Sequence, residues 1–169
     1  MKNTVIFLSL FAFLVSFQDG ARKIPAVDLK TLEGKTVNSS AFSNDGKPMI
    51  ISFWATWCSP CKKELNAVAE VYDDWKKETG VKLIAISIDD SKSSNKVAPY
   101  VNTKGWEYEE YLDINSDFRR AMGVVDPPQT FIVDGKGNIV WQHIGFADGN
   151  EELYIEVVRK LVKGEKIEH

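Results

Sequence analysis

The chain has 169 residues, a formal net charge of −3 and a hydrophobic fraction of 44%, which is ordinary for one soluble globular domain. Acidic and basic residues are interspersed without a basic stripe, so nucleic acid is excluded as an expected partner. Two histidines and two cysteines in the whole chain are too few for a His-rich metal site or a histidine-based catalytic dyad.

The N-terminus carries an apolar segment, residues 5–17, which is interrupted only by two serines. Its length suits the hydrophobic region of a signal peptide and falls short of the roughly 20 residues that a spanning helix needs. A buried N-terminal helix or strand is the alternative. The cleavage site is poorly marked, so we interpret residues 1–21 as a signal peptide or an N-terminal membrane anchor, followed by one domain over residues 22–169.

Export implies an oxidising envelope compartment in which a disulfide persists. The expected location is therefore the periplasm or the outer side of the bacterial inner membrane. No cysteine lies near the leader, which excludes lipid modification of a cysteine there.

Short strands and turns precede the longest periodic segment. Residues 26–30 and 36–38 are predicted to form two strands around a glycine-containing turn, which gives an N-terminal hairpin. One helical turn is expected to follow up to Phe42, and residues 44–48 carry a strong turn signal. The apolar run at residues 49–54 predicts a strand covered on both faces.

The longest periodic segment begins beside the two cysteines and ends at Gly80. Apolar residues recur at helical spacing from Ser59 onward, with charged residues mostly on the other faces, which predicts one amphipathic helix. Its apolar stripe consists of Leu65, Val68, Ala69, Tyr72 and Trp75. The run at residues 81–88, rich in β-branched side chains, predicts a further strand.

Weaker signals follow in the C-terminal half, where residues 89–105 are polar with a weak helical pattern. The remaining expected elements are a short strand within residues 107–114, a helical turn at 118–122, a hairpin of 129–133 and 138–144, and a helix over 151–162 that turns Leu153, Val157, Val158 and Leu161 inward. The order of elements predicts an α/β fold with a central mixed β-sheet flanked by helices and an inserted helix and strand segment.

The two cysteines stand as Cys58-Ser59-Pro60-Cys61, between the predicted strand and the predicted helix. This placement puts the first sulfur at the helix N-terminus, where unpaired N–H groups and the helix dipole favour the thiolate. Pro60 fits the first turn, where its missing N–H costs little. Cys61 faces the same side one turn deeper and should be less exposed. We therefore expect Cys58 to be the attacking sulfur and Cys61 the resolving sulfur.

Three other interpretations of the cysteine pair are weaker. A purely structural disulfide would close a ring of four residues, which stabilises a fold little. A zinc site needs four ligands, and the chain has only two thiols. Covalent haem attachment needs a histidine after the second cysteine, where Lys62 stands.

Two segments resemble one known family. Residues 53–64 (FWATWCSPCKKE) and 128–134 (PQTFIVD) resemble the active-site helix and the cis-proline strand of the TlpA/ResA branch of the thioredoxin-like proteins. The resemblance covers roughly residues 24–163. It implies a thioredoxin-like fold, exported thiol–disulfide oxidoreductase activity with no metal or organic cofactor, and a cis peptide bond before Pro128, packed beside the dithiol.

Two departures from the thioredoxin pattern are informative. Many thioredoxins carry a buried acid six positions before the first cysteine, where this chain has Ser52. The expected substitute is Glu64, which lies three residues after Cys61 on its helical face and would tune the proton affinity of the dithiol. The alternative is a first-turn glutamate that only favours the helix dipole. The second departure is Pro127, which has a carbonyl but no N–H to offer a bound substrate segment.

Residues around the cysteines are expected to contact the substrate. These candidate substrate-binding residues are Trp57, Ser59, Pro60, Pro127 and Pro128. By contrast, Trp54 is expected in the core, His143 as a structural residue, and Asp89-Asp90 as a cap or turn pair without chemistry.

The expected reaction is thiol–disulfide exchange with a protein disulfide in the envelope, sustained by a membrane-embedded thiol electron donor. A monomer is expected, with an N-terminal membrane tether if the leader is retained. The substrate stays open among apocytochrome thiols, other envelope proteins and a peroxidase partner. Two rival functions are a thiol peroxidase of the same fold, which usually has a proline and a threonine before its cysteine, and an envelope binding module with a structural disulfide.

Overall fold

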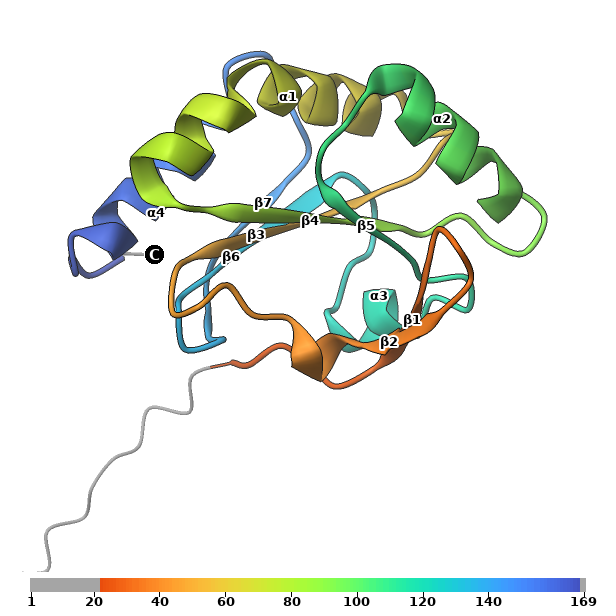
Figure 1. Cartoon of the computed structure of the whole chain (residues 1–169), viewed down its shortest axis with the longest axis horizontal. Coiled ribbons are helices and arrows are strands. Elements are labelled where there is room, and N and C mark those ends of the chain that lie inside the picture. The colour runs from red at the N-terminus through yellow and green to blue at the C-terminus, as the bar shows by residue number, and fades with distance from the viewer. Residues whose placement is uncertain (1–21, 168–169) are drawn as a thin grey trace, which may run out of the picture.

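The computed structural model describes residues 22–167, which form a seven-stranded sheet with helices on both faces (Figure 1). The strand order is β2-β1-β5-β4-β3-β6-β7. The strands are β1 (Asp28–Thr31), β2 (Thr36–Asn38), β3 (Met49–Trp54), β4 (Lys82–Ser87), β5 (Glu109–Leu112), β6 (Gln129–Val133) and β7 (Ile139–Ile144). The expected leader, residues 1–21, lies outside the described residues.

The sheet is mixed, as the sequence predicts. Its central strands β3, β4 and β5 are parallel, whereas β6 and β7 on one side and the β1–β2 hairpin on the other are antiparallel. Every residue of β3 is buried, which confirms the expectation that this apolar run is covered on both faces.

Three helices cover one face of the sheet and a short one covers the other (Figure 1). The covering set on the first face is α1 (Ser59–Thr79), α2 (Val97–Lys104) and α4 (Glu151–Val162), and the opposite face carries α3 (Asp117–Ala121). Two 3-10 turns, η1 (Ser39–Ala41) and η2 (Ser94–Lys96), complete the described elements. Helix α1 ends at Gly80, whose φ of +68° is the left-handed conformation that favours glycine.

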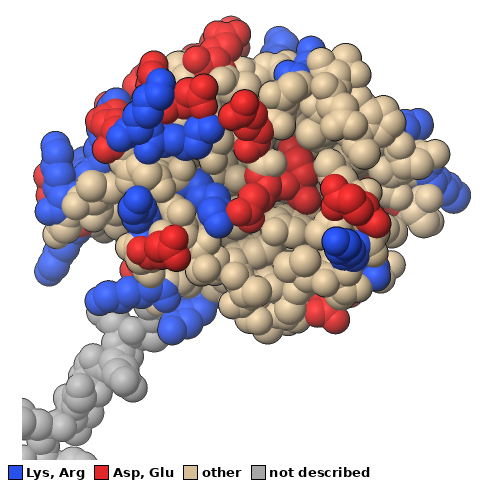
Figure 2. Space-filling view, viewed as in Figure 1, with Lys and Arg blue, Asp and Glu red and all other residues tan. Residues whose placement is uncertain are grey.

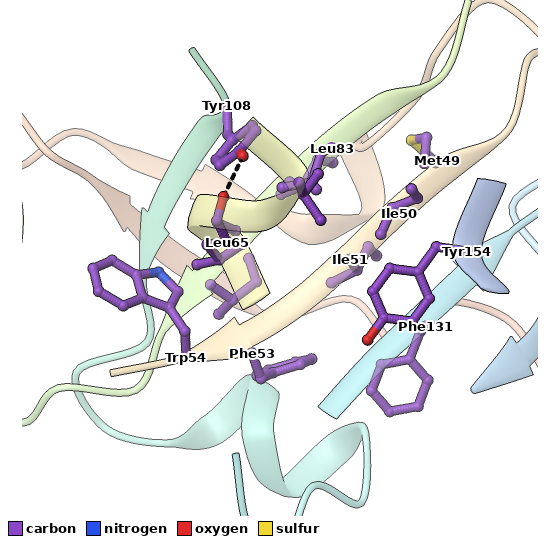
Figure 3. Packing of buried hydrophobic residues seen from close by; sticks show 14 of the residues in the cluster. Met49, Ile50, Ile51, Phe53, Trp54, Leu65, Leu83, Tyr108, Phe131 and Tyr154 are labelled. Carbon is purple, nitrogen blue, oxygen red and sulfur yellow. Dashed lines mark hydrogen bonds between the residues drawn. The ribbon is translucent and has the colours of Figure 1, made fainter. Parts of the chain in front are cut away.

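Side chains of β3 alternate between the two halves of the core (Figure 3). Phe53 packs against Phe118 of α3, with ring centroids 5.4 Å apart. Trp54 turns to the other face and meets Trp106 edge-on at 5.1 Å, so its expected place in the core is confirmed. On that face Figure 3 shows the Tyr108 hydroxyl donating to the Leu65 carbonyl of α1, at 2.7 Å. These contacts fix α1 on the sheet.

The inward face of α4 differs from the expected one by a single position. Val157 and Val158 are buried as predicted, but Leu153 is 40% exposed, and Tyr154 and Ile155 point inward instead. The Tyr154 ring packs edge-on against Trp141 at 5.8 Å, so the large aromatic side chain sets the rotation of the helix. The inward prediction for Leu153 was therefore wrong.

Strand β3 runs from one end of the sheet to the other. The turn at residues 44–48 lies at the start of β3, and the dithiol follows its end.

No helix within residues 22–167 has the length and apolar content needed to cross a bilayer.

Candidate active site: the dithiol at the start of α1

Cys58 caps the N-terminus of α1, as the sequence predicts. Its backbone is extended (φ −88°, ψ 102°), and its sulfur accepts the Cys61 N–H at 3.3 Å. The two cysteines form a disulfide with their Cα atoms 5.4 Å apart. Ser59 and Pro60 occupy the first two helical positions. The missing N–H of Pro60 costs no hydrogen bond there, because N–H groups in the first turn have no partner within the helix. The sulfur of Cys58 therefore lies where the helix presents unpaired N–H groups.

The two sulfur-bearing side chains differ in burial. Cys58 is 5% exposed and Cys61 is fully buried, so Cys61 is the deeper residue, as expected. Ser59 and Pro60 are exposed at the rim of the ring, and Trp57 is 62% exposed beside them. A reaction partner thus meets Cys58 before it meets Cys61.

The Pro127–Pro128 segment lies beside the dithiol. The peptide bond between these prolines is cis, as the family resemblance implies. The Pro127 carbonyl oxygen lies 3.7 Å from the Cys58 sulfur, and Pro128 is buried behind it. The Pro128 carbonyl accepts the Gly145 N–H at 2.8 Å, which fixes the segment to the end of β7.

The loop before Cys58 is held by the buried carboxylate of Asp89, which the sequence analysis assigned only to a cap or turn pair. Asp89, at the end of β4, accepts the Thr56 N–H at 2.8 Å and the Thr56 hydroxyl at 2.6 Å. Its neighbour Ser87 donates to the same carboxylate at 2.9 Å. The expectation of a turn pair fits Asp90, which accepts local N–H groups, whereas Asp89 positions the active-site loop. Lys62 also donates to the Thr56 carbonyl, at 3.0 Å, so a positive charge lies near the helix start.

Glu64 is buried under the first turns of α1, with 1% of its surface exposed. One carboxylate oxygen accepts the Thr130 hydroxyl at 2.6 Å and the Ser52 hydroxyl at 3.1 Å. The Tyr154 hydroxyl faces the same carboxyl. Neither that hydroxyl nor Glu64 Oε2 makes a hydrogen bond of good geometry within the described part of the chain. Burial raises the pKa of Glu64 to about 7, against the opposing effect of the hydroxyl donors.

The buried Glu64 carboxyl lies next to Ser52, the position where the chain lacks the acid of many thioredoxins. Ser52 stands where many thioredoxins carry an acid, and here its hydroxyl donates to the carboxyl that α1 supplies from above. Ser52 lies opposite Thr130 of β6, which donates to the same oxygen. A carboxyl therefore lies at the Ser52 position, but it comes from the helix instead of the strand.

A second buried carboxyl lies on the same face of the sheet. Strand register aligns Ser52 with Ala85 and Ala85 with Glu110, so Glu110 shares a row with the Glu64 partners. Glu110 accepts the Trp54 indole N–H at 3.2 Å, and burial raises the pKa of Glu110 well above its usual range. The sequence analysis missed this carboxyl because a glutamate in a short strand is normally expected to be exposed.

The other polar candidates belong to the structure of the domain. His143 stacks on Trp141 and lies 2.9 Å from the Asn150 amide through Nε2, which confirms its expected structural role.

Within residues 22–167 no group of three or more His, Cys, Asp or Glu side chains is placed to hold a metal ion. The reactive groups gathered here are thus two sulfurs, a buried carboxyl and backbone dipoles, which suit electron-pair transfer between sulfurs.

Fold and site together define a thiol–disulfide oxidoreductase of the thioredoxin-like class. The chain belongs to the AhpC/TSA family, whose family model matches residues 21–142. The thioredoxin-like resemblance that residues 53–64 and 128–134 carry is confirmed by this match and by the named relatives below.

Curated relatives and a solved structure share most of the chain. The thiol-disulfide oxidoreductase ResA of Bacillus thuringiensis (strain Al Hakam) is 31% identical over 83% of this chain and 78% of its own. The thiol:disulfide interchange protein DsbE of Yersinia pestis is 31% identical over 84% of this chain and 72% of its own. An uncharacterized thioredoxin-like protein from Porphyromonas gingivalis, solved in solution, is 54% identical with a TM-score of 0.75, covering 86% of this chain and 95% of its own.

The buried Glu64 carboxyl predicts a pH-dependent stability. Its pKa is raised from 4.5 to about 7, so the folded state binds its proton more tightly than the unfolded chain does. The free energy of unfolding should therefore fall as pH rises through this window, by about 3 kcal/mol at most. Glu64→Gln removes that loss, so denaturant titrations of the oxidised protein should show the variant gaining stability over the parent between pH 4.5 and 8.

Glu70→Gln, at an exposed position of the same helix, is the matched control and should leave the pH dependence unchanged. Glu110 contributes in the same direction in both proteins and cancels in the difference. Parallel stability curves for Glu64→Gln and the parent would contradict the prediction.

Proposed function

We propose that the chain is an exported thiol–disulfide oxidoreductase that reduces disulfides of envelope proteins through Cys58 and Cys61. The observation that carries this proposal is the position of the Cys58 sulfur, which caps α1 and lies 3.7 Å from the Pro127 carbonyl. Cys61, buried behind it, is close enough to close the disulfide. The ring can thus open and close without rearrangement of the sheet.

The proposed reaction begins with the reduced protein. The Cys58 thiolate attacks one sulfur of the partner disulfide, the partner S–S bond breaks, and the departing thiolate takes a proton from water. The Cys61 thiol then loses its proton and attacks the Cys58 sulfur. The mixed disulfide breaks, the second partner sulfur leaves as a thiolate that takes up the proton released from Cys61, and the Cys58–Cys61 disulfide forms. The partner gains two electrons from the two cysteine sulfurs and two protons, one from water and one from Cys61, and no cofactor takes part.

Glu64 is proposed to accept the Cys61 proton. It follows Cys61 by one helical turn on the same face, and its pKa of about 7 suits a group that exchanges protons near neutral pH. Its almost complete burial favours this role over that of a surface glutamate that only interacts with the helix dipole. Thr130 and Ser52 hold the carboxyl in place by their hydrogen bonds.

The substrate is proposed to dock on the rim around Cys58. Trp57, Ser59 and Pro60 are exposed there, and Pro127 lines the opposite side with Pro128 buried behind it. Because Pro127 has no N–H, a bound extended segment loses one of the two backbone hydrogen bonds that this position normally provides. Fit to the side chains of the rim therefore contributes more to the choice of partner.

The cellular setting of the proposal follows from the leader. Residues 1–21 direct the chain to the periplasm or the outer side of the inner membrane and tether it where they are retained. A membrane-embedded thiol carrier returns the electron pair to the Cys58–Cys61 disulfide after each turnover. The protein acts as a monomer in this scheme.

The rival functions are separable by simple assays. A thiol peroxidase of the same fold would consume hydrogen peroxide rapidly in the reduced form. A binding module with a structural disulfide would keep its partner after Cys58→Ser and reduce no insulin disulfides. The proposed oxidoreductase reduces insulin and loses that activity with Cys58→Ser.

The order of attack predicts a trapped intermediate. Cys61→Ser stops the reaction after the first step, because no second sulfur is present to resolve the mixed disulfide. Expressed in the native envelope, this variant should accumulate partner adducts that dithiothreitol releases, as seen on non-reducing gels. The variant with both Cys58→Ser and Cys61→Ser is the control and should show none. Adducts that form through Cys61 in Cys58→Ser but not through Cys58 in Cys61→Ser would reverse the assignment.

The missing N–H of Pro127 predicts a gain of activity on substitution. Pro127→Ile restores a backbone donor worth about 1 kcal/mol, so reduction of a generic peptide disulfide should rise about five-fold in kcat/KM. Val125→Ala, at an exposed position two residues before Pro127, is the comparison variant and should change the rate little. An unchanged kcat/KM for Pro127→Ile would exclude backbone docking at this position.

A further inference from the structure

A basic surface lies at the end of the sheet opposite the dithiol. It is a concavity of about 380 Å³ whose lining includes Lys23, Lys47 and Lys136 and no acidic residue. All three lysines are exposed, and within residues 22–167 none of them lies within salt-bridge distance of a carboxylate. Figure 2 shows several basic side chains, with acidic ones among them, near the point where the described chain begins.

Two turns form this surface and fit closely together. A Cβ added to Gly135 would lie 1.8 Å from the Gly46 carbonyl oxygen, so the turns at residues 44–47 and 134–137 touch through their backbones. Asp45 and Asp134 stand in the same two turns and offset part of the charge of the three lysines, which still outnumber them. The positive charge is therefore held on a rigid support.

The same surface receives the start of the described chain. Lys23 bridges to Asn138, and the Ile139 N–H donates to the Arg22 carbonyl at 2.7 Å. In the sequence, the apolar run ends at Phe17, only six residue steps before Lys23. An extended chain of that length spans about 20 Å at most. A membrane that holds the apolar run must then lie within that distance of Lys23.

The dithiol lies at the far end of the sheet from this surface. β3 leads from Met49, which lines the basic concavity, to Trp54, four residues before Cys58. Six strand residues extend over about 20 Å. One face of the domain can therefore meet a membrane while the other presents Cys58 to soluble proteins.

We propose that the surface of Lys23, Lys47 and Lys136 lies against the anionic phospholipid headgroups of the membrane that holds the N-terminal segment, so that the dithiol faces away from the bilayer. This inference rests on the tether included in the proposed function. Each lysine near an anionic surface strengthens the attraction about five-fold. The attraction decays over about 8 Å at physiological ionic strength, and the short connection to Phe17 keeps the lysines close enough to experience it.

Acylation of lysines in the reconstituted full-length chain tests the proposal. The chain is incorporated into vesicles of phosphatidylcholine alone, or with about one third phosphatidylglycerol, and each lysine's rate of acetylation is followed by mass spectrometry. Lys23, Lys47 and Lys136 should react at least about three-fold more slowly on the anionic vesicles, and about 0.5 M salt should remove the difference. Lys92 and Lys96 are exposed in the segment that follows the C-terminal end of β4, away from the basic surface. They are internal controls and should react equally on both vesicles.

A charge-reversal pair gives a second readout. With Lys47→Glu and Lys136→Glu together, Lys23 should react on anionic vesicles as fast as on neutral ones, whereas Lys92→Glu with Lys96→Glu should leave its protection intact. Equal rates for the three lysines on both vesicles, or protection of Lys92 and Lys96 instead, would overturn the proposal. Equal protection by inorganic phosphate without vesicles would also overturn it, in favour of a soluble anion site. A chain that fails to stay on the vesicles refutes the tether, and none of these results depends on thiol activity.

Discussion

The site depends on one electrostatic contact, between the Cys58 sulfur and the unpaired N–H groups at the start of α1. In the proposed reaction, these groups and the helix dipole stabilise the negative charge of the Cys58 thiolate. The rest of the domain holds the contact in place. β3 delivers the chain to the helix start, Asp89 fixes the intervening loop through Thr56, and the Pro127 carbonyl closes the other side.

A buried carboxyl lies beneath the ring, on the side away from the exposed rim. Glu64 is buried with a pKa of about 7, so near neutral pH it takes up or gives up a proton at little cost. The two steps of exchange make opposite demands, because Cys58 must be ionised to attack while Cys61 must stay protonated until its turn. In the proposed reaction, the helix terminus meets the first demand and the buried Glu64 carboxyl meets the second. The Ser52 and Thr130 hydroxyls keep the carboxyl in register with the sheet.

Much of this architecture was readable from the sequence because it rests on local patterns. The runs at Met49–Trp54 and Gln129–Val133 and the periodic segment Glu151–Val162 were predicted with the bounds that the structure has. The first cysteine's place at a helix start followed from adjacent residues alone. The cis bond at Pro128 followed from the family resemblance, since no local signal distinguishes it from an ordinary turn.

What the sequence did not reveal depends on contacts between distant segments. The depth at which Glu64 is buried requires Thr130, which is 66 positions away, and the orientation of Asp89 requires Thr56 from another loop. Leu153 was misassigned because the Tyr154 ring, packed on Trp141, sets the rotation of α4. The basic surface likewise appears only when two turns meet in space, while the charges remain interspersed along the chain.

The most direct test of this account is the pH dependence of alkylation of Cys58 in the reduced protein. With iodoacetamide and mass spectrometry to separate the two sulfurs, Cys58 should titrate at least about one unit below the ordinary thiol value of about 8.5, and Cys61 should react far more slowly. If both sulfurs titrate together near the ordinary value, the helix start does not activate Cys58, and the account is contradicted.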